Sequence, residues 1–384
     1  MSSTAASLPP PSAAALAVSR SLGALLRDTI AAAGGWLDFA RFMELALYAP
    51  GLGYYSGGST KIGVAGDFVT APELGHSFGR AVARTLAAEL DAGGGAAILE
   101  LGAGTGSLAE QILDAFARGE RVVEYRILEP SAELRERQRA RLARFGARVE
   151  WLERLPERPF DGAIVANEVL DALPVTRFVK RAGGAVPIGV TTTNDGFSWA
   201  EGAPQAALAA AVTALEARLE RPLPEGFVSE ICSALPAWIT ALAAALGTGS
   251  VLLVDYGLTR REYYHVDRNG GTLTCHYRQR AHADPFAYPG LNDISAWVDF
   301  SACADAAADA GLEVAGFTTQ AQYLVAALAA QPPPPAADAA SIRELAGLKT
   351  LLLPGEMGER FKVLLLRKNV QGEPLPGRDF RARL

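Results

Sequence analysis

The stretch that decides the fold of this chain reads Ile98-Leu99-Glu100-Leu101-Gly102-Ala103-Gly104-Thr105-Gly106-Ser107. Its apolar first half predicts a buried strand, and a helical pattern begins directly after the last glycine. Glycines at such a junction permit positive φ angles and let a ligand touch the backbone where the helix starts. The stretch therefore predicts a nucleotide-like ligand held at the end of a strand.

The spacing of the glycines narrows the class of ligand. One residue separates Gly104 from Gly106, whereas the dinucleotide fingerprint G-x-G-x-x-G has two residues at that point. The G-x-G-x-G spacing favours S-adenosylmethionine, because the amino-acid end of that molecule carries no pyrophosphate. The predicted cofactor contacts in this stretch are Glu100, Gly102, Gly104, Thr105 and Gly106.

Short apolar runs alternate with amphipathic helices from this stretch onward. The runs cover residues 97–101, 125–128, 149–152, 162–166 and 251–254, and two later ones cover 312–318 and 361–367. Such alternation is typical of βαβ units, in which a mainly parallel sheet is covered by helices on both faces. We therefore expect an α/β fold with the seven-stranded, Rossmann-like sheet of a class I methyltransferase.

The rest of the chain is assigned around this sheet. Residues 1–20 are expected to form a mobile tail, and residues 21–95 an N-terminal helical lead that ends in Gly93-Gly94-Gly95. The core would then comprise residues 96–176, 250–258 and 298–384. Residues 177–249 and 259–297 are too long for simple crossovers, so we expect α+β inserts that cap the carboxyl edge of the sheet and bind substrate. The four prolines at 332–335 predict a surface loop or flexible linker.

Polar side chains follow two of the predicted strands. Glu129 ends the second strand, where a carboxylate can accept both ribose hydroxyls of an adenosine group. Asn167 and Glu168 end the fourth strand, with Asp171 close behind. Asn167 also offers polar contacts to the cofactor, while the carboxylates of Glu168 and Asp171 can hold a cationic acceptor and receive its proton. We predict Asn167, Glu168 and Asp171 as catalytic residues. A helix N-cap or a loop salt bridge is the alternative role of Glu168 and Asp171, and simple solvation at the strand end is the alternative for Glu129.

Composition disfavours several other classes of protein. The chain has 384 residues, 49% of them hydrophobic, and a net charge of −6, which argues against a protein that binds nucleic acid through phosphate contacts. Apolar stretches are too short to span a bilayer, and the N-terminal pattern is a poor match to a signal or transit peptide. We expect a cytoplasmic protein in a bacterium, or a mitochondrial one in a eukaryote. A homodimer is compatible with the sequence, which does not determine the oligomeric state.

Neither cysteines nor histidines show a metal-binding pattern. The cysteines lie far apart in the sequence, which indicates a reducing compartment, and no histidine has a second histidine or cysteine at ligand spacing. Methyl transfer from a sulfonium is an in-line displacement that depends on positioning, so we expect no metal. The residues concerned are Cys232, Cys275, Cys303, His76, His265, His276 and His282.

Several further motifs, read in order along the chain, support a family assignment. They are Gly66-Asp67-Phe68-Val69-Thr70-Ala71-Pro72-Glu73, Leu99 to Gly106, Leu128-Glu129-Pro130-Ser131 with Leu134 and Gln138, Ala166 to Pro174, Asp255-Tyr256-Gly257, Pro289-Gly290 with Asp293-Ile294, Val298-Asp299-Phe300, and Met357-Gly358-Glu359-Arg360-Phe361-Lys362. In these motifs the chain resembles the MidA family of S-adenosylmethionine-dependent methyltransferases, the bacterial relatives of a mitochondrial complex I assembly factor. The resemblance covers nearly the whole chain. Ala103 departs from it, since many relatives carry proline there.

The resemblance implies a methyltransferase domain with inserts and, by analogy with the mitochondrial relatives, symmetric dimethylation of an arginine on a protein of a respiratory complex. It places Asp67 and Thr70 near the amino-acid end of the cofactor, the glycines beneath it and Glu129 on the ribose. Three alternatives stay open: a methyltransferase with a small-molecule acceptor, an assembly protein that binds the cofactor without catalysis, and a nicotinamide oxidoreductase, which the glycine spacing disfavours.

Overall fold

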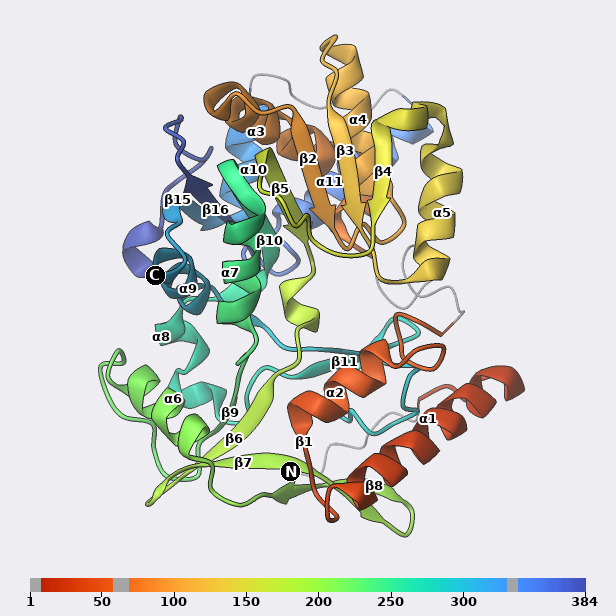
Figure 1. Ribbon diagram of the computed structural model, residues 1–384, viewed down its shortest axis with the longest axis vertical. Helices are drawn as coiled ribbons and strands as arrows, with labels where there is room; N and C mark the ends of the chain where they lie inside the picture. Colours follow the sequence, from red (N-terminus) through yellow and green to blue (C-terminus); the bar gives the residue numbers. More distant parts are fainter. Residues whose placement is uncertain (1–7, 58–68, 330–337) are drawn as a thin grey trace.

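The protein is described by a computed structural model, which covers residues 8–57, 69–329 and 338–384. Figure 1 shows two halves stacked along the long axis, an upper half around a large sheet and a lower half around smaller ones. The proline run at 332–335 and the predicted contact Asp67 lie outside the described residues. Within the described ranges, no helix is long and apolar enough to cross a membrane.

The upper half contains a mixed sheet of eight strands in the order β15-β16-β10-β5-β2-β3-β4, with the short β14 paired to β10. Its strands are β2 (Ala97–Leu101), β3 (Glu124–Leu128), β4 (Val149–Leu152), β5 (Phe160–Asn167), β10 (Leu246–Leu258), β14 (Val298–Asp299), β15 (Glu313–Thr319) and β16 (Phe361–Lys368). β16 runs antiparallel to both of its neighbours, β10 and β15, whereas β10, β5, β2, β3 and β4 are parallel to one another.

All seven strands predicted from apolar runs are present. Six of them lie within two residues of their predicted bounds, while β10 extends well beyond both predicted ends and β14 was not predicted. The runs are continuous because both faces of the sheet are buried. Ile98 of β2 packs with one group of helices and its neighbour Leu99 with the other.

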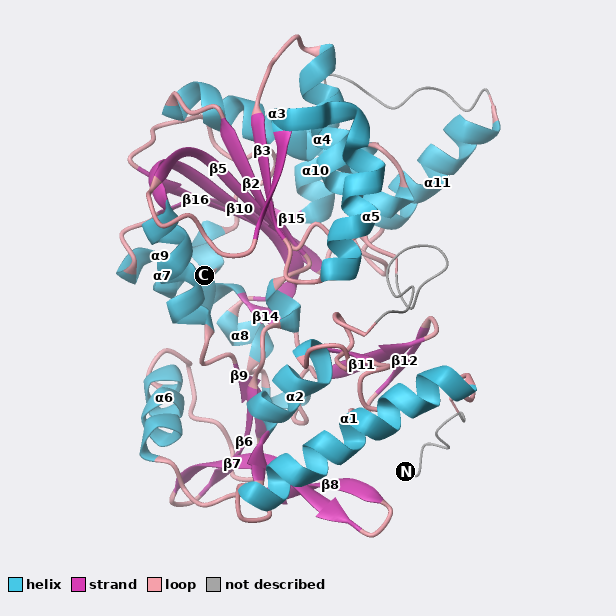
Figure 2. Cartoon of the chain, turned by 45° about the vertical axis from the view of Figure 1, so that its right-hand side comes forward, coloured by secondary structure: helices cyan, strands magenta, loops and turns pink. Residues whose placement is uncertain are grey.

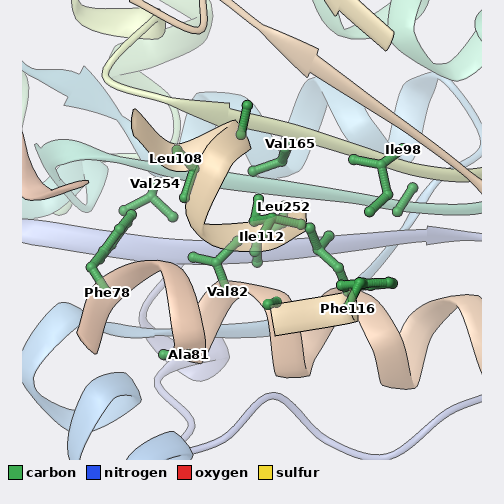
Figure 3. Packing of buried hydrophobic residues seen from close by; sticks show 14 of the residues in the cluster. Phe78, Ala81, Val82, Ile98, Leu108, Ile112, Phe116, Val165, Leu252 and Val254 are labelled. Atoms are coloured by element: carbon green, nitrogen blue, oxygen red, sulfur yellow. The ribbon is translucent and has the colours of Figure 1, made fainter. Parts of the chain in front are cut away.

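Helices cover both faces of this sheet (Figure 2). They are α3 (Ser77–Gly93), α4 (Ser107–Arg118), α5 (Ala132–Leu142), α7 (Leu235–Ala245), α9 (Phe300–Asp309), α10 (Gln320–Leu328) and α11 (Ala339–Leu352). One cluster joins α3, α4 and α10 to the sheet, and Figure 3 shows Phe78 and Val82 of α3 beside Ile112 of α4 and Val254 of β10. The opposite cluster joins α7 and α9 to the other face.

The lower half combines the N-terminal segment with the two inserts. Its elements are α1 (Ala13–Ala32), β1 (Leu37–Asp38), α2 (Phe39–Tyr48), β6 (Thr176–Arg181), β7 (Gly184–Thr193), β8 (Gly196–Glu201), α6 (Ala206–Glu216), β9 (Val228–Ile231), α8 (Arg260–Tyr263), β11 (Thr274–Tyr277), β12 (Arg280–His282) and β13 (Asp293–Ser295). β1 pairs with β7, and Phe39 and Phe42 of α2 pack against Trp199 and Phe197 of β8. The lead and the first insert therefore share one hydrophobic core.

Three predicted boundaries are wrong. The tail was expected to reach residue 20, but α1 begins at Ala13, where Ser12 Oγ accepts a hydrogen bond from Ala15 N at 3.2 Å. α3 was assigned to the lead and α7 to an insert, yet both pack on the central sheet. The apolar face of each helix predicts that it is buried against another element. The order of elements along the chain does not show that this element is the central sheet.

Candidate active site

A cavity lies at the carboxyl edge of the central sheet, where β2, β3 and β5 end. Its lining residues are Tyr48, Tyr55, Thr70, Pro72, Glu100, Leu101, Gly102, Ala103, Gly104, Thr105, Ser107, Leu108, Leu128, Glu129, Pro130, Leu134, Asn167, Glu168, Val169, Ala172 and Trp238. Ligands of open α/β sheets bind at this edge. Most of the residues predicted from strand ends therefore meet in one place.

The glycine turn connects β2 to α4 and forms one wall of the cavity. The φ angles of Gly102, Gly104 and Gly106 are 61°, 55° and 80°, values that residues other than glycine rarely adopt. A Cβ atom at Gly102 would lie 3.1 Å from Val169 Cγ2. The turn therefore needs glycine for its backbone and, at Gly102, for the space beside the next strand. Gly106 caps α4 and is absent from the cavity lining among the described residues.

Glu129 lines the cavity and is held in place by two neighbours. Its Oε1 accepts a hydrogen bond from Ser131 N at 3.0 Å, and its Oε2 accepts one from Gln138 Nε2 at 3.0 Å. The same Gln138 nitrogen donates to Gly104 O at 2.9 Å, so Gln138 ties the carboxylate to the glycine turn. Burial raises the pKa of Glu129, and the hydrogen bonds from Ser131 and Gln138 oppose that shift.

Glu100 is a second carboxyl group in the same wall. It is 2% exposed, and its Oε2 accepts a hydrogen bond from Tyr125 OH at 2.8 Å. Burial raises the pKa of Glu100 to about 8, the Tyr125 bond opposes the shift, and the charge of Glu129 adds to it. The side chain is thus largely neutral near pH 7 and can donate as well as accept a hydrogen bond.

The hydroxyl group of Thr105 makes two side-chain hydrogen bonds. It donates one to Glu73 Oε1 and accepts one from Arg141 Nη1 at 3.0 Å. Arg141 also pairs with Glu110 of α4 at 2.8 Å. These contacts fix the glycine turn between α4, α5 and the segment before α3. The turn and the carboxyl ends of β2 and β3 form the wall that we call the cofactor wall, and the contacts pre-organise it.

Asn167 and Glu168 stand at the end of β5. Glu168 has a φ of 55°, an unusual backbone conformation for a residue with a side chain, and Glu168 N donates to Val254 O at 2.9 Å. Its carboxylate Oε1 accepts hydrogen bonds from Ala71 N and Asn167 Nδ2, both at 3.2 Å. Burial raises the pKa of Glu168 to about 8, and the nearby charge of Asp171 adds to the shift.

Asp171 lies behind the wall rather than in the cavity. It is 6% exposed, is absent from the described lining, and accepts a hydrogen bond from Tyr256 OH. The neighbouring carboxylate of Asp255 accepts hydrogen bonds from Val169 N at 3.1 Å, Leu170 N at 2.9 Å and Asp171 N at 3.3 Å. The prediction that Asp171 grips the acceptor directly is therefore not supported by its position; its carboxylate instead helps to hold the turn that carries Glu168.

Sequence reasoning missed three aromatic residues of the lining. Tyr48 and Tyr55 lie within residues 21–95, for which the sequence predicts only a helical lead. Trp238 belongs to α7, whose contact with the sheet was not foreseen. No periodic signal connects these positions to β5, because they reach the cavity only through tertiary packing.

The site fits a nucleoside that carries an amino-acid group. Glu129, whose carboxylate is held by Ser131 and Gln138, directly follows β3 beside the glycine turn. A carboxylate at this position can accept hydrogen bonds from the hydroxyl groups of a ribose. Asn167 Oδ1 is buried with no hydrogen-bond partner among the described residues, so it is available to a ligand donor such as an ammonium group. In the same part of the chain, no group of three or more histidine, cysteine, aspartate or glutamate side chains could hold a metal ion.

Comparison with known proteins agrees with this site. Residues 81–318 match a family described as S-adenosyl-L-methionine-dependent methyltransferase. A crystal structure from Burkholderia thailandensis, of a protein described as a methyl transferase and bound to S-adenosyl-homocysteine, is 42% identical; the match covers 97% of this chain and 99% of that chain, with a TM-score of 0.89. A second structure from the same organism and superfamily gives a TM-score of 0.86 at 42% identity.

More distant relatives include named enzymes. The mitochondrial protein arginine methyltransferase NDUFAF7 of Danio rerio is 28% identical over 304 residues, which cover 70% of this chain and 68% of the relative. Its homologue in Caenorhabditis elegans is 28% identical over 323 residues, which cover 76% and 73%. The predicted fold, cofactor and family resemblance are confirmed, and the chain belongs to this family of S-adenosyl-L-methionine-dependent methyltransferases.

Proposed function

We propose that this enzyme methylates arginine side chains of a protein substrate and forms symmetric dimethylarginine on a protein of a respiratory complex. The observation that carries the proposal is Glu168, a desolvated carboxylate in the lining of the cavity beside Asn167. Its raised pKa reflects the cost of charge at this position, and a bound cation offsets that cost. The named arginine methyltransferases among the relatives support the same acceptor.

The cofactor-binding roles follow from the lining. Glu129 would hold the ribose hydroxyls, while Gly102 and Gly104 let the amino-acid end approach the backbone. Asn167 Oδ1 would accept a hydrogen bond from the ammonium group, with Thr70 nearby in the lining. S-adenosylmethionine supplies an electrophilic methyl group on a sulfonium, and no metal is required for its transfer.

The acceptor-binding role belongs to Glu168. A guanidinium group has a pKa above about 12, so a lone neutral base would leave it protonated. An ionised Glu168 can orient the group, share its positive charge and take the proton that the nitrogen releases when it gains the methyl group. Asp255 supports this role, because its carboxylate accepts hydrogen bonds from Val169 N and Asp171 N in the turn that follows Glu168.

Labelled methyl transfer tests the proposal. The protein is incubated with methyl-labelled S-adenosylmethionine and an extract of cells that lack it, and the labelled proteins are hydrolysed to amino acids. We expect label in symmetric dimethylarginine. Label in a small molecule, in lysine or in a nucleic acid would overturn the arginine assignment, and tight cofactor binding without any transfer would favour a non-catalytic assembly protein.

A further inference from the structure

Tyr48 and Tyr55 are the two aromatic residues that the N-terminal segment contributes to the cavity. Tyr48 ends α2 and Tyr55 follows it closely, and both line the same cavity as Gly102 and Glu168. Neither is part of the glycine turn or of the strand ends that hold the cofactor. They therefore form a separate part of the lining.

The hydroxyl groups of both tyrosines are tied to the protein. Tyr48 OH donates to Ala172 O at 3.0 Å, and Tyr55 OH donates to Asp293 Oδ1 at 2.9 Å. The two rings are stacked, with centroids 5.6 Å apart and planes at 23°. Because the hydroxyl groups already have partners, the rings themselves are what the pair offers to a ligand.

The electrostatics of the cavity favour a positively charged ligand. Its described lining contains the carboxyl groups of Glu129 and Glu168, besides Glu100, which is largely neutral near pH 7, and contains neither lysine nor arginine. Burial raises the pKa of Tyr48 and Tyr55, and the nearby negative charges of Asp293 and Asp171 add to both shifts. An aromatic face in such surroundings attracts a cation by its quadrupole.

Tyr48 also lines a second, more open groove on the surface. The other described residues of this groove are Asp38, Ala40, Arg41, Glu44, Pro174, Ser233 and Ala234. Within it Arg41 and Glu44 pair with each other at 2.7 Å, which leaves the carboxylate of Asp38 as the remaining charge. Tyr48 thus lines both the outer groove and the inner cavity.

We infer that Tyr48 and Tyr55 form the acceptor wall, on which the planar cation of the acceptor stacks while Glu168 binds its edge. The inference rests on the proposed function, because it names the residues that would select a guanidinium. A delocalised planar cation presents its face to the rings and two N–H groups in its plane to a carboxylate, whereas an ammonium group is a compact point charge with no face to stack.

Binding of small cations tests the acceptor wall without turnover. n-Butylguanidinium and n-butylammonium are titrated into the complex of the enzyme with S-adenosylhomocysteine, and heat is measured. The wild type should bind the guanidinium about tenfold more tightly than the ammonium. Tyr48→Leu and Tyr55→Leu should weaken guanidinium binding about tenfold, whereas Tyr48→Phe and Tyr55→Phe, which keep the rings, should stay within about threefold.

The outcomes separate this inference from the proposed function. Unchanged S-adenosylhomocysteine affinity shows that each variant is folded at the cofactor wall. A wild type that binds no guanidinium, or leucine variants that bind it as well as the wild type does, would overturn the acceptor wall even if arginine is methylated. Ring-dependent guanidinium binding without any labelled arginine would keep the wall and overturn the proposed substrate.

Discussion

The cavity has two walls that are built in different ways. The cofactor wall consists of the glycine turn and the ends of β2 and β3, which adjoin in one parallel sheet. The acceptor wall, formed by Tyr48 and Tyr55, comes from a segment that pairs with a separate sheet in the lower half. One wall is made mainly by the backbone, whereas the other is made by side chains.

This difference predicts how each wall responds to substitution. Within the cofactor wall, Gly102 tolerates no Cβ atom, because its φ angle would be strained and Val169 would be crowded. A wall made of side chains keeps its shape when a ring is preserved and loses its function when the ring is removed. Glu168 lies between the two walls, so changes there should separate cofactor binding from methyl transfer.

The largest effect is expected from Gly102→Val. A β-branched side chain strongly disfavours a φ of 61°, and its Cβ would crowd Val169. Affinity for S-adenosylhomocysteine, measured by calorimetry, should fall about 1000-fold. Gly34→Val is a matched control, because Gly34 has a φ of 81° and open space around its Cβ. Equal loss of affinity in both variants would contradict a local role for the turn.

Glu168→Gln should separate the two walls. Methyl transfer to protein should fall about 100-fold, because the amide can neither share the charge of a guanidinium nor accept its proton. Affinity for S-adenosylhomocysteine should stay within about threefold, since Gln keeps an oxygen that can accept from Ala71 N. Undiminished transfer in this variant would remove Glu168 from the chemistry.

Glu129→Gln should act on the cofactor wall alone. In this variant an amide nitrogen replaces one of the two carboxylate oxygens, which accept from Gln138 and would accept from the ribose hydroxyls. Affinity for S-adenosylhomocysteine should therefore fall about 30-fold. Glu124→Gln is the control, because Glu124 lies at the exposed start of the same strand, β3. If the two variants bind alike, Glu129 has no part in recognising the ribose.

The pH dependence of transfer should report the ionisation of Glu168. Its pKa is raised to about 8, so the carboxyl group is protonated and unable to hold a cation at lower pH. The value of kcat/KM should therefore rise nearly tenfold between about pH 6.5 and 7.5 and level off above about pH 8. The same rise in Glu168→Gln would assign it to another group.

The smallest effect concerns stability and the carboxyl group of Glu100. Its pKa is about 8 in the folded protein against 4.5 in the unfolded chain, so its stabilising contribution is complete below pH 4.5 and is lost as pH rises through 8. Glu100→Gln stays neutral and keeps an acceptor for Tyr125 OH. The Tm of the variant relative to the wild type should increase by about 2 °C between about pH 6 and 9. Parallel Tm curves for the two proteins would show that Glu100 stays ionised.

Much of the fold and of the cofactor wall could be predicted from the sequence. Buried parallel strands are continuous apolar runs, and the carboxyl ends of parallel strands lie at one edge of the sheet, so Glu129 and Asn167 could be placed at the same edge from the sequence. For Asp171 the sequence predicts contact with the acceptor, whereas its carboxylate accepts a hydrogen bond from Tyr256; a strand end shows which residues emerge, but not which way each of them turns.

The acceptor wall could not be predicted in this way. Tyr48 and Tyr55 are separated from β5 by more than a hundred residues, and they reach the cavity because β1 joins the N-terminal segment to β7. Local periodicity carries no information about such a contact. The wrong assignments of α3 and α7 have the same origin, since an amphipathic helix does not specify its partner.

The position of β16 has a consequence for how this protein is made. β16 lies between β10 and β15, although it follows both of them along the chain. During translation the ribosome must pass Lys368 before this strand can close the gap, so until then β10 and β15 each present an unpaired edge. The nascent chain should therefore depend on chaperones until β16 has emerged, well after the glycine turn and β5.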